Sequence, residues 1–215
     1  MNGPLPHEPA PQLDEREFLR WYGAWEPLGP AEIVDFMAGF DRPWWVVGGW
    51  SIEAFTGVPR EHDDLDLSML ACDAPAFRDF LGGRYTPWAV GAGALRPYSR
   101  RHPDIGADGQ LWVREHAGAP WILDVPLTPD TDGRWTNKRW REHVAPVEDV
   151  TWVADDGVRY LLPEVTLMMK ARLDRDKDRA DLEVAWPLLG SAERGWVRRA
   201  IAAAHPGHPW LDRLG

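Results

Sequence analysis

Short apolar runs separated by glycine- and proline-rich turns dominate most of the chain, whereas the last quarter is amphipathic with helical spacing. Apolar runs bounded by turn residues are typical of buried strands, and apolar positions three and four apart are typical of helices. The change of period near residue 163 predicts a protein of the α/β (α+β) class. We expect an N-terminal extension over residues 1–28, a sheet domain over 29–162 and a C-terminal helical region over 163–215.

The same periods predict the individual elements. Strands are expected over residues 44–47, 84–88, 111–114 and 121–127, with a hairpin over 151–161. Helices are expected over residues 13–21, 31–37 and 74–81, from residue 163, and over 177–189 and 192–204. Residues 91–109 are rich in turn formers and should be irregular. The C-terminal tail should fold back onto the protein, with the side chain of Trp210 inserted as a plug.

Residues 44–70 form the most informative stretch of the chain. An apolar run ends at Gly48 and Gly49, whose backbone can turn sharply and aim N–H groups at a ligand. A short helix is expected to begin near Ser51, and the N-terminus of a helix favours phosphate. Gly57 should end this helix in the left-handed conformation.

Two acids at alternate positions follow this turn. In the run Asp64-Leu65-Asp66-Leu67, a strand period of two places both carboxylates on one face and both leucines on the other. Because neighbouring carboxylates repel each other, a cation should lie between them, and a pair of Mg²⁺ ions carrying a nucleoside triphosphate suits oxygen ligands.

Asp124 is a third candidate because it interrupts an otherwise apolar strand, where a lone charge is costly. If its strand neighbours that of Asp64 and Asp66, all three carboxylates can converge on one metal-bound phosphate. Each acid also has a structural alternative, with Asp64 capping a turn and Asp124 pairing with an arginine. The combination of glycine turn, acid pair and later strand acid favours the metal site.

Cations near these acids could serve a triphosphate. Arg60 precedes the acid pair and could reach the phosphates, although a surface arginine beside a turn is the alternative. Lys170 lies between apolar neighbours, so its ammonium either reaches solvent or faces a charged ligand. Lys177 and Asp181 are four residues apart, and the default interpretation is a solvated ion pair on a helix.

Composition and charge narrow the function classes. The chain has 215 residues, of which 44% are hydrophobic and 27% charged, as in an ordinary globular protein. The formal charge of −10 disfavours a long nucleic-acid groove, although a brief contact with a tRNA end stays open. The single cysteine, Cys72, excludes an internal disulfide, and no apolar run is long enough for a membrane span. We therefore expect a cytoplasmic protein, either a monomer or a homodimer.

The motifs resemble a known family. Val47-Gly48-Gly49-Trp50-Ser51, Gly57, Arg60 and His62-Asp63-Asp64-Leu65-Asp66-Leu67 are similar to the aminoglycoside and lincosamide adenylyltransferases of the polymerase-beta-type nucleotidyltransferase superfamily. The resemblance continues through Asp124, Lys170-Ala171 and Lys177-Asp178 with Asp181, and thus covers most of the chain after about residue 28. One departure is Trp50, which stands directly after the second glycine where many superfamily members have serine.

The resemblance implies a mixed sheet flanked by helices. It also implies that Asp64 and Asp66 bind Mg²⁺, with Asp124 as a third ligand or as the base toward the acceptor hydroxyl. Gly48, Gly49 and Ser51 would hold the triphosphate, and Arg60, Lys170 and Lys177 complete the expected nucleotide-binding set.

The expected activity is transfer of a nucleoside monophosphate, AMP from ATP or another triphosphate, to a hydroxyl of a small molecule. Two Mg²⁺ ions would assist, and an aminoglycoside-like or lincosamide-like antibiotic is one acceptor class. Two rivals remain: a toxin-type nucleotidyltransferase that modifies tRNA or protein, and a non-catalytic nucleotide-binding protein on the same fold.

Overall fold

Two four-stranded sheets form the centre of the molecule. The computed structural model describes residues 14–91, 94–106 and 109–214. The first sheet has the order β10-β11-β1-β2 and the second the order β4-β3-β5-β6. Their strands are β1 (Trp44–Val46), β2 (Leu67–Met69), β3 (Thr86–Gly91), β4 (Ala94–Pro97), β5 (Gln110–Arg114), β6 (Leu123–Pro126), β10 (Thr151–Val153) and β11 (Arg159–Leu161).

The edges of these sheets meet where β2 runs beside β6. Parallel bridges join Asp66 to Asp124 and Leu70 to Thr128, and the Thr128 N–H donates to the Met69 carbonyl at 2.8 Å. Strand β1 is parallel to β11 and antiparallel to β2. The result is a continuous mixed sheet surface in which the start of β6 lies next to the start of β2.

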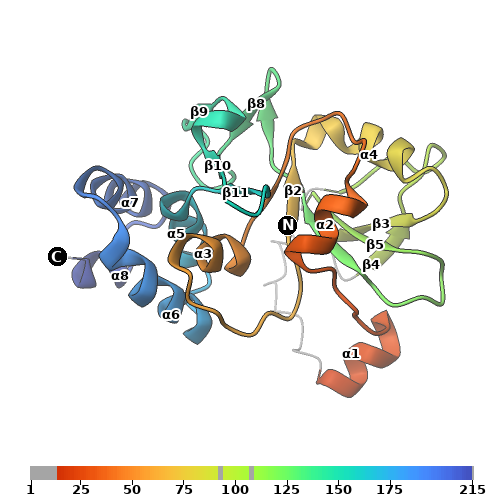
Figure 1. Ribbon diagram of the computed structural model, residues 1–215, viewed down its shortest axis with the longest axis horizontal. Coiled ribbons are helices and arrows are strands. Elements are labelled where there is room, and N and C mark those ends of the chain that lie inside the picture. Colours follow the sequence, from red (N-terminus) through yellow and green to blue (C-terminus); the bar gives the residue numbers. More distant parts are fainter. Residues whose placement is uncertain (1–13, 92–93, 107–108, 215) are drawn as a thin grey trace, which may run out of the picture.

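Helices cover this surface unevenly. The C-terminal helices gather on one side of the molecule together with α3, and the strands β3 to β5 lie on the other (Figure 1). The helices are α1 (Glu15–Tyr22), α2 (Pro30–Phe36), α3 (Gly49–Thr56), α4 (Ala74–Leu81), α5 (Pro163–Ala171), α6 (Asp176–Ala185), α7 (Ser191–Ala204) and α8 (Trp210–Arg213). A small sheet of β7 (Asp130–Thr131), β8 (Arg134–Thr136) and β9 (Val144–Ala145) projects from one edge.

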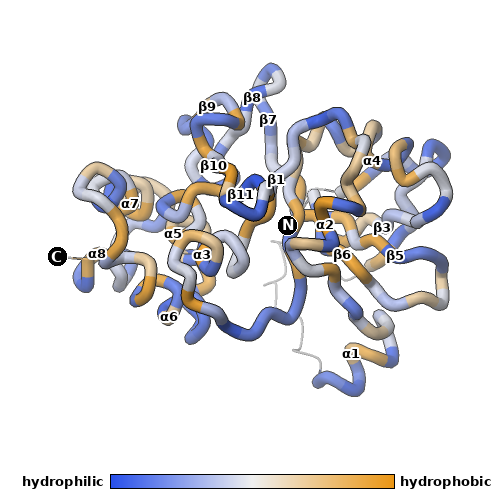
Figure 2. Tube along the Cα trace, viewed as in Figure 1, coloured by the Kyte–Doolittle hydropathy of each residue, from blue (hydrophilic) through white to orange (hydrophobic). Residues whose placement is uncertain are grey.

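Burial follows the apolar pattern. One core cluster underlies the sheets, and a second lies among α5, α6, α7 and α8 and includes Ile52 of α3. Trp210 is fully buried in that second core, as expected of a plug. The connection from α3 to β2 is hydrophilic (Figure 2). None of the described helices has the length and apolar character that crossing a membrane requires.

Several expectations need correction. Residues 94–97 form β4 rather than irregular chain, because they pair with β3 in antiparallel register. The helix expected over residues 13–21 should have Phe18, Leu19 and Trp21 as its apolar side, but in α1 Leu19 and Trp21 are exposed, while Phe18 and Tyr22 pack on Trp112 of β5. The predicted division at residues 28 and 162 stays a prediction.

Candidate active site

The turn between β1 and α3 is built around Gly48. Its φ of 73° lies in the region that favours glycine, and a Cβ there would fall 2.5 Å from Asp66 Oδ2. A Cβ on Gly49 would collide with the Arg60 guanidinium. The two glycines therefore let an acid and a cation approach the backbone closely. Gly57 ends α3 with φ 68°, as predicted.

Ser51 supports this turn from inside. Its side chain is fully buried, and its hydroxyl donates to the Gly48 carbonyl at 3.0 Å and lies 2.8 Å from Thr166 Oγ1. The hydroxyl is thus bonded to the turn and to α5, and a contact of Ser51 with phosphate stays a prediction. We assign Ser51 to fixing the turn that carries Gly48.

Three carboxylates converge beside Gly48. Oxygens of Asp64, Asp66 and Asp124 all lie within 4.8 Å of one another. Leu65 and Leu67 are fully buried between and behind the pair, so the alternation expected from the sequence holds. The acids precede β2 rather than lying within it, and Asp124 reaches them through the bridge that joins β6 to Asp66.

The carboxylates are held at a cost in free energy. Burial and then the charge of Asp64 raise the pKa of Asp66 to about 7. Burial raises the pKa of Asp64, and burial with the charge of Asp66 raises that of Asp124 well above its ordinary value. Ionising all three groups together is thus unfavourable until a cation joins them.

Gln110 is a member of the site that sequence reasoning missed. Its side-chain amide donates to both oxygens of Asp124, at 2.9 and 2.8 Å. Gln110 lies on β5, which pairs with β6. Only the register between these two strands brings Gln110 close to Asp124. A glutamine at a strand start carries no signal of its own in the sequence.

A polar cavity of about 330 Å³ opens over the carboxylates. The residues that line it come from the glycine turn, the loop before β2, the central strands and the α5–α6 region: Gly48, Gly49, Trp50, Arg60, His62, Asp63, Asp64, Asp66, Gln110, Asp124, Lys170, Leu173, Arg175 and Lys177. Every predicted site residue except Ser51 is in this wall. The cavity thus combines a three-carboxylate cluster with several cations.

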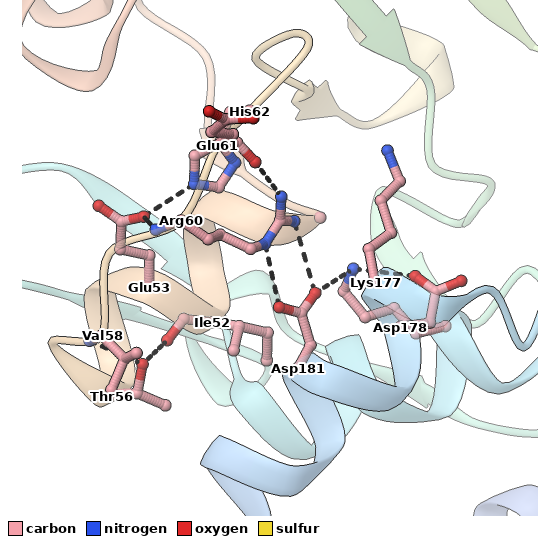
Figure 3. Close-up of polar contacts among 12 residues, drawn as sticks. Ile52, Glu53, Thr56, Val58, Arg60, Glu61, His62, Lys177, Asp178 and Asp181 are labelled. Atoms are coloured by element: carbon pink, nitrogen blue, oxygen red, sulfur yellow. Dashed lines mark hydrogen bonds and ion pairs between the residues drawn. The ribbon is translucent and has the colours of Figure 1, made fainter.

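The cations are tied to α6 rather than free. Lys170 is 7% exposed, and its Nζ lies 2.7 Å from Asp181 and 3.2 Å from Asp178. Arg60 Nε donates to Asp181 at 3.0 Å, and Figure 3 shows the two facing each other. Asp181 therefore links Arg60, in the loop before the acid pair, to Lys170 of α5. Arg60 and Asp181 are 121 residues apart in the sequence.

Lys177 does not pair with Asp181, so the expected four-residue ion pair is wrong. Its side chain extends away from Asp181 (Figure 3), and its Nζ lies 3.0 Å from Asp63. Position along the helix predicted the wrong partner because the loop with Asp63 and Arg60 folds over α6 and supplies competing charges. His62, beside this loop, stacks on Trp50 at 3.8 Å between ring centroids and bonds Glu53.

Sequence comparison links the first part of this site to known enzymes. Residues 31–87, which include the glycine turn and the acid pair, match the model of the aminoglycoside-2''-adenylyltransferase family. No curated protein is detectably similar to the chain in sequence.

Solved structures extend the likeness to the fold. The lincomycin-bound lincosamide antibiotic adenylyltransferase LnuA is 19% identical, with a TM-score of 0.52 over 76% of this chain and 100% of that one. The antibiotic-resistance factor ANT(2'')-Ia is 20% identical, with a TM-score of 0.49 over 85% of this chain and 92% of that one. Residues 31–87 are thus similar to the aminoglycoside-2''-adenylyltransferase family, and the likeness to LnuA shows that the chain shares its fold, as the motifs predict.

Proposed function

We propose that the protein transfers a nucleoside monophosphate, AMP from ATP, to a hydroxyl group of a small molecule and releases pyrophosphate. The observation that carries this proposal is the meeting of Asp64, Asp66 and Asp124 beside the backbone of Gly48. The sequence places the acids on two segments, and the parallel bridge between β2 and β6 unites them.

The donor set fits a hard divalent cation. All three side chains offer carboxylate oxygens, with no histidine or cysteine in the group, which is the ligand preference of Mg²⁺. Their raised pKa values indicate that positive charge would be strongly stabilised between them. Bound there, two Mg²⁺ ions would supply charge neutralisation at the triphosphate and at the acceptor oxygen.

The chain's own groups supply positioning and a proton acceptor. The acceptor oxygen forms a bond to the α-phosphorus, and the bond from that phosphorus to the bridging oxygen breaks, leaving its electron pair on pyrophosphate. The hydroxyl proton passes to Asp124, whose carboxylate Gln110 orients by donating to both of its oxygens. The Gly48 turn brings backbone close to the reacting phosphate.

A pyrophosphate-release assay tests the activity. Purified protein is incubated with Mg²⁺ and each of the four ribonucleoside triphosphates, with a panel of aminoglycosides, lincosamides, other small hydroxyl compounds and bulk tRNA. We expect acceptor-dependent release with ATP and transfer of label from α-³²P-ATP to a small molecule. Label that enters only tRNA or protein would contradict the small-molecule acceptor, and nucleotide binding without release under all conditions would contradict transfer.

The carboxylate cluster also predicts how stability depends on pH. The pKa of Asp66 rises on folding from 3.8 to about 7, so between these values the unfolded chain has lost a proton that the folded chain keeps. Stability of the metal-free protein therefore falls as pH rises from about 4 to 7, and the loss is complete above 7.

Mg²⁺ should reverse this loss, because it binds the ionised carboxylates. At 100 times its Kd a ligand adds about 2.7 kcal/mol, which is roughly 5–10 °C in Tm for a chain of this size. Thermal unfolding with EDTA or Mg²⁺, at pH 5 and pH 7.5, measures the effect. Equal Mg²⁺ shifts at both pH values, or an undiminished shift in Asp66→Asn, would contradict the metal site.

A further inference from the structure

A second cavity adjoins the carboxylate cavity on the other side of Gly48. It has a volume of about 260 Å³ and shares Gly48, Lys170, Leu173 and Arg175 with its neighbour. Its remaining wall is mostly apolar and aromatic, from Trp45, Val47, Pro126, Leu127, Trp135, Leu161 and Met169. A transferase with two substrates needs two adjoining compartments, and the polar one already holds the glycine turn and the carboxylates.

The charges around this second cavity all have one sign. Lys138, Arg139, Lys170 and Arg175 line it, and none of its lining residues within the described part of the chain is an aspartate or a glutamate. Lys170 and Arg175 are neutralised by Asp178 and Asp181 of α6. Arg139, in the segment that follows β8, adds a further positive charge to this wall.

Arg139 belongs to this wall and has no acidic partner among the described residues. No carboxylate of the described residues forms an ion pair with its guanidinium. Burial, and then the nearby charges of Arg172 and Arg141, lower the pKa of Arg139. A guanidinium in the cavity wall with no acidic partner among the described residues favours an anionic group on the ligand.

Trp45 contributes an aromatic side chain to this wall. It is fully buried, and its indole N–H, which has no hydrogen-bond acceptor in the described part of the chain, is closed off from the cavity as well. Trp45 therefore offers a ligand apolar surface rather than a donor. An apolar, aromatic wall with a guanidinium that has no acidic partner among the described residues suits a ring-bearing compound that carries an anionic group.

We propose that this cavity binds the acceptor, and that the acceptor is a hydroxyl compound with an apolar or aromatic body and an anionic group such as a carboxylate or phosphate. The assignment rests on the proposed nucleotidyl transfer and narrows its acceptor. Polycationic compounds, aminoglycosides among them, would meet Arg139 with like charge, and none of the described residues that line the wall is an aspartate or a glutamate. The adjoining carboxylates would be occupied by metal ions during transfer.

Binding of matched dyes tests the charge preference without requiring turnover. The anionic dye 1-anilinonaphthalene-8-sulfonate and its neutral analogue N-phenyl-1-naphthylamine share an aromatic body. We expect the anionic dye to bind one site and its Kd to rise about 10-fold or more in Arg139→Gln, the loss typical of one charged hydrogen bond. Arg139→Lys should largely restore binding, and binding of the neutral dye should not respond to Arg139→Gln.

Arg134→Gln is the matched control, since it removes an exposed arginine from the same hairpin and lies outside the cavity wall. Unchanged affinity for the anionic dye in Arg139→Gln would overturn the proposal. Competitive displacement of the dye by Mg²⁺-ATP would assign the cavity to the nucleotide base and also overturn it. In the turnover assay, a polycationic acceptor whose use is insensitive to Arg139→Gln would refute the acceptor class while leaving nucleotidyl transfer intact, whereas absence of any transfer would refute the proposed activity itself.

Discussion

Replacing Asp64 or Asp66 by asparagine abolishes nucleotidyl transfer while the fold is kept. Each substitution removes a negative charge from a cluster within 4.8 Å, and so removes a ligand that the metal ions need. Loss of one such ligand costs several kcal/mol of transition-state stabilisation, so we expect a fall in kcat of at least about 100-fold. The fold survives because asparagine fits the same space and relieves repulsion between carboxylates. Pyrophosphate release, together with circular dichroism and thermal unfolding, measures both effects.

Asp63→Asn is the matched control for these variants. Asp63 adjoins Asp64 in the sequence, is exposed, and pairs with Lys177 rather than with the carboxylate cluster. An exposed pair of this kind contributes little, about 1 kcal/mol or less, so transfer should persist within several-fold. Turnover retained in Asp64→Asn, or lost equally in Asp63→Asn, would remove the assignment of the cluster as the metal site.

Replacing Asp181 by alanine strongly destabilises the folded protein. Asp181 is 2% exposed and is shared by Lys170 and Arg60, so its loss leaves buried positive charge without compensation. Removing one partner of a buried ion pair costs about 3–5 kcal/mol. For a chain of this size that corresponds to a fall in Tm of roughly 6–20 °C. Thermal or urea unfolding at pH 7.5 measures it.

Asp176→Ala provides the comparison on the same helix. Asp176 has a fully exposed side chain and pairs with Arg179 at the surface, where solvent screens the pair, so its replacement should leave Tm almost unchanged. Lys170→Met in the Asp181→Ala background should recover part of the loss, because the unpaired ammonium is then absent. Equal effects of Asp181→Ala and Asp176→Ala would show that the network between α5, α6 and the loop of Arg60 contributes nothing to stability.

The sequence by itself determined the local parts of the site. Gly48 is required because the backbone turns there with positive φ, and glycine at the end of an apolar run marks such turns. The alternation of Asp64 and Asp66 with buried Leu65 and Leu67 follows from the period of an extended chain and needs no partner. The end of α3 at Gly57 is likewise a local matter, as is the hairpin that joins β10 to β11.

Only the tertiary structure decided which distant groups meet. The register between β2 and β6 brings Asp124 to Asp66, and that between β5 and β6 brings Gln110 to Asp124. Position along α6 favoured Lys177 as the partner of Asp181, but the loop of Arg60 folds over that helix and Lys170 points into it from α5. Charges choose partners by distance and burial in space, and sequence spacing reports distance only within a single helix or strand.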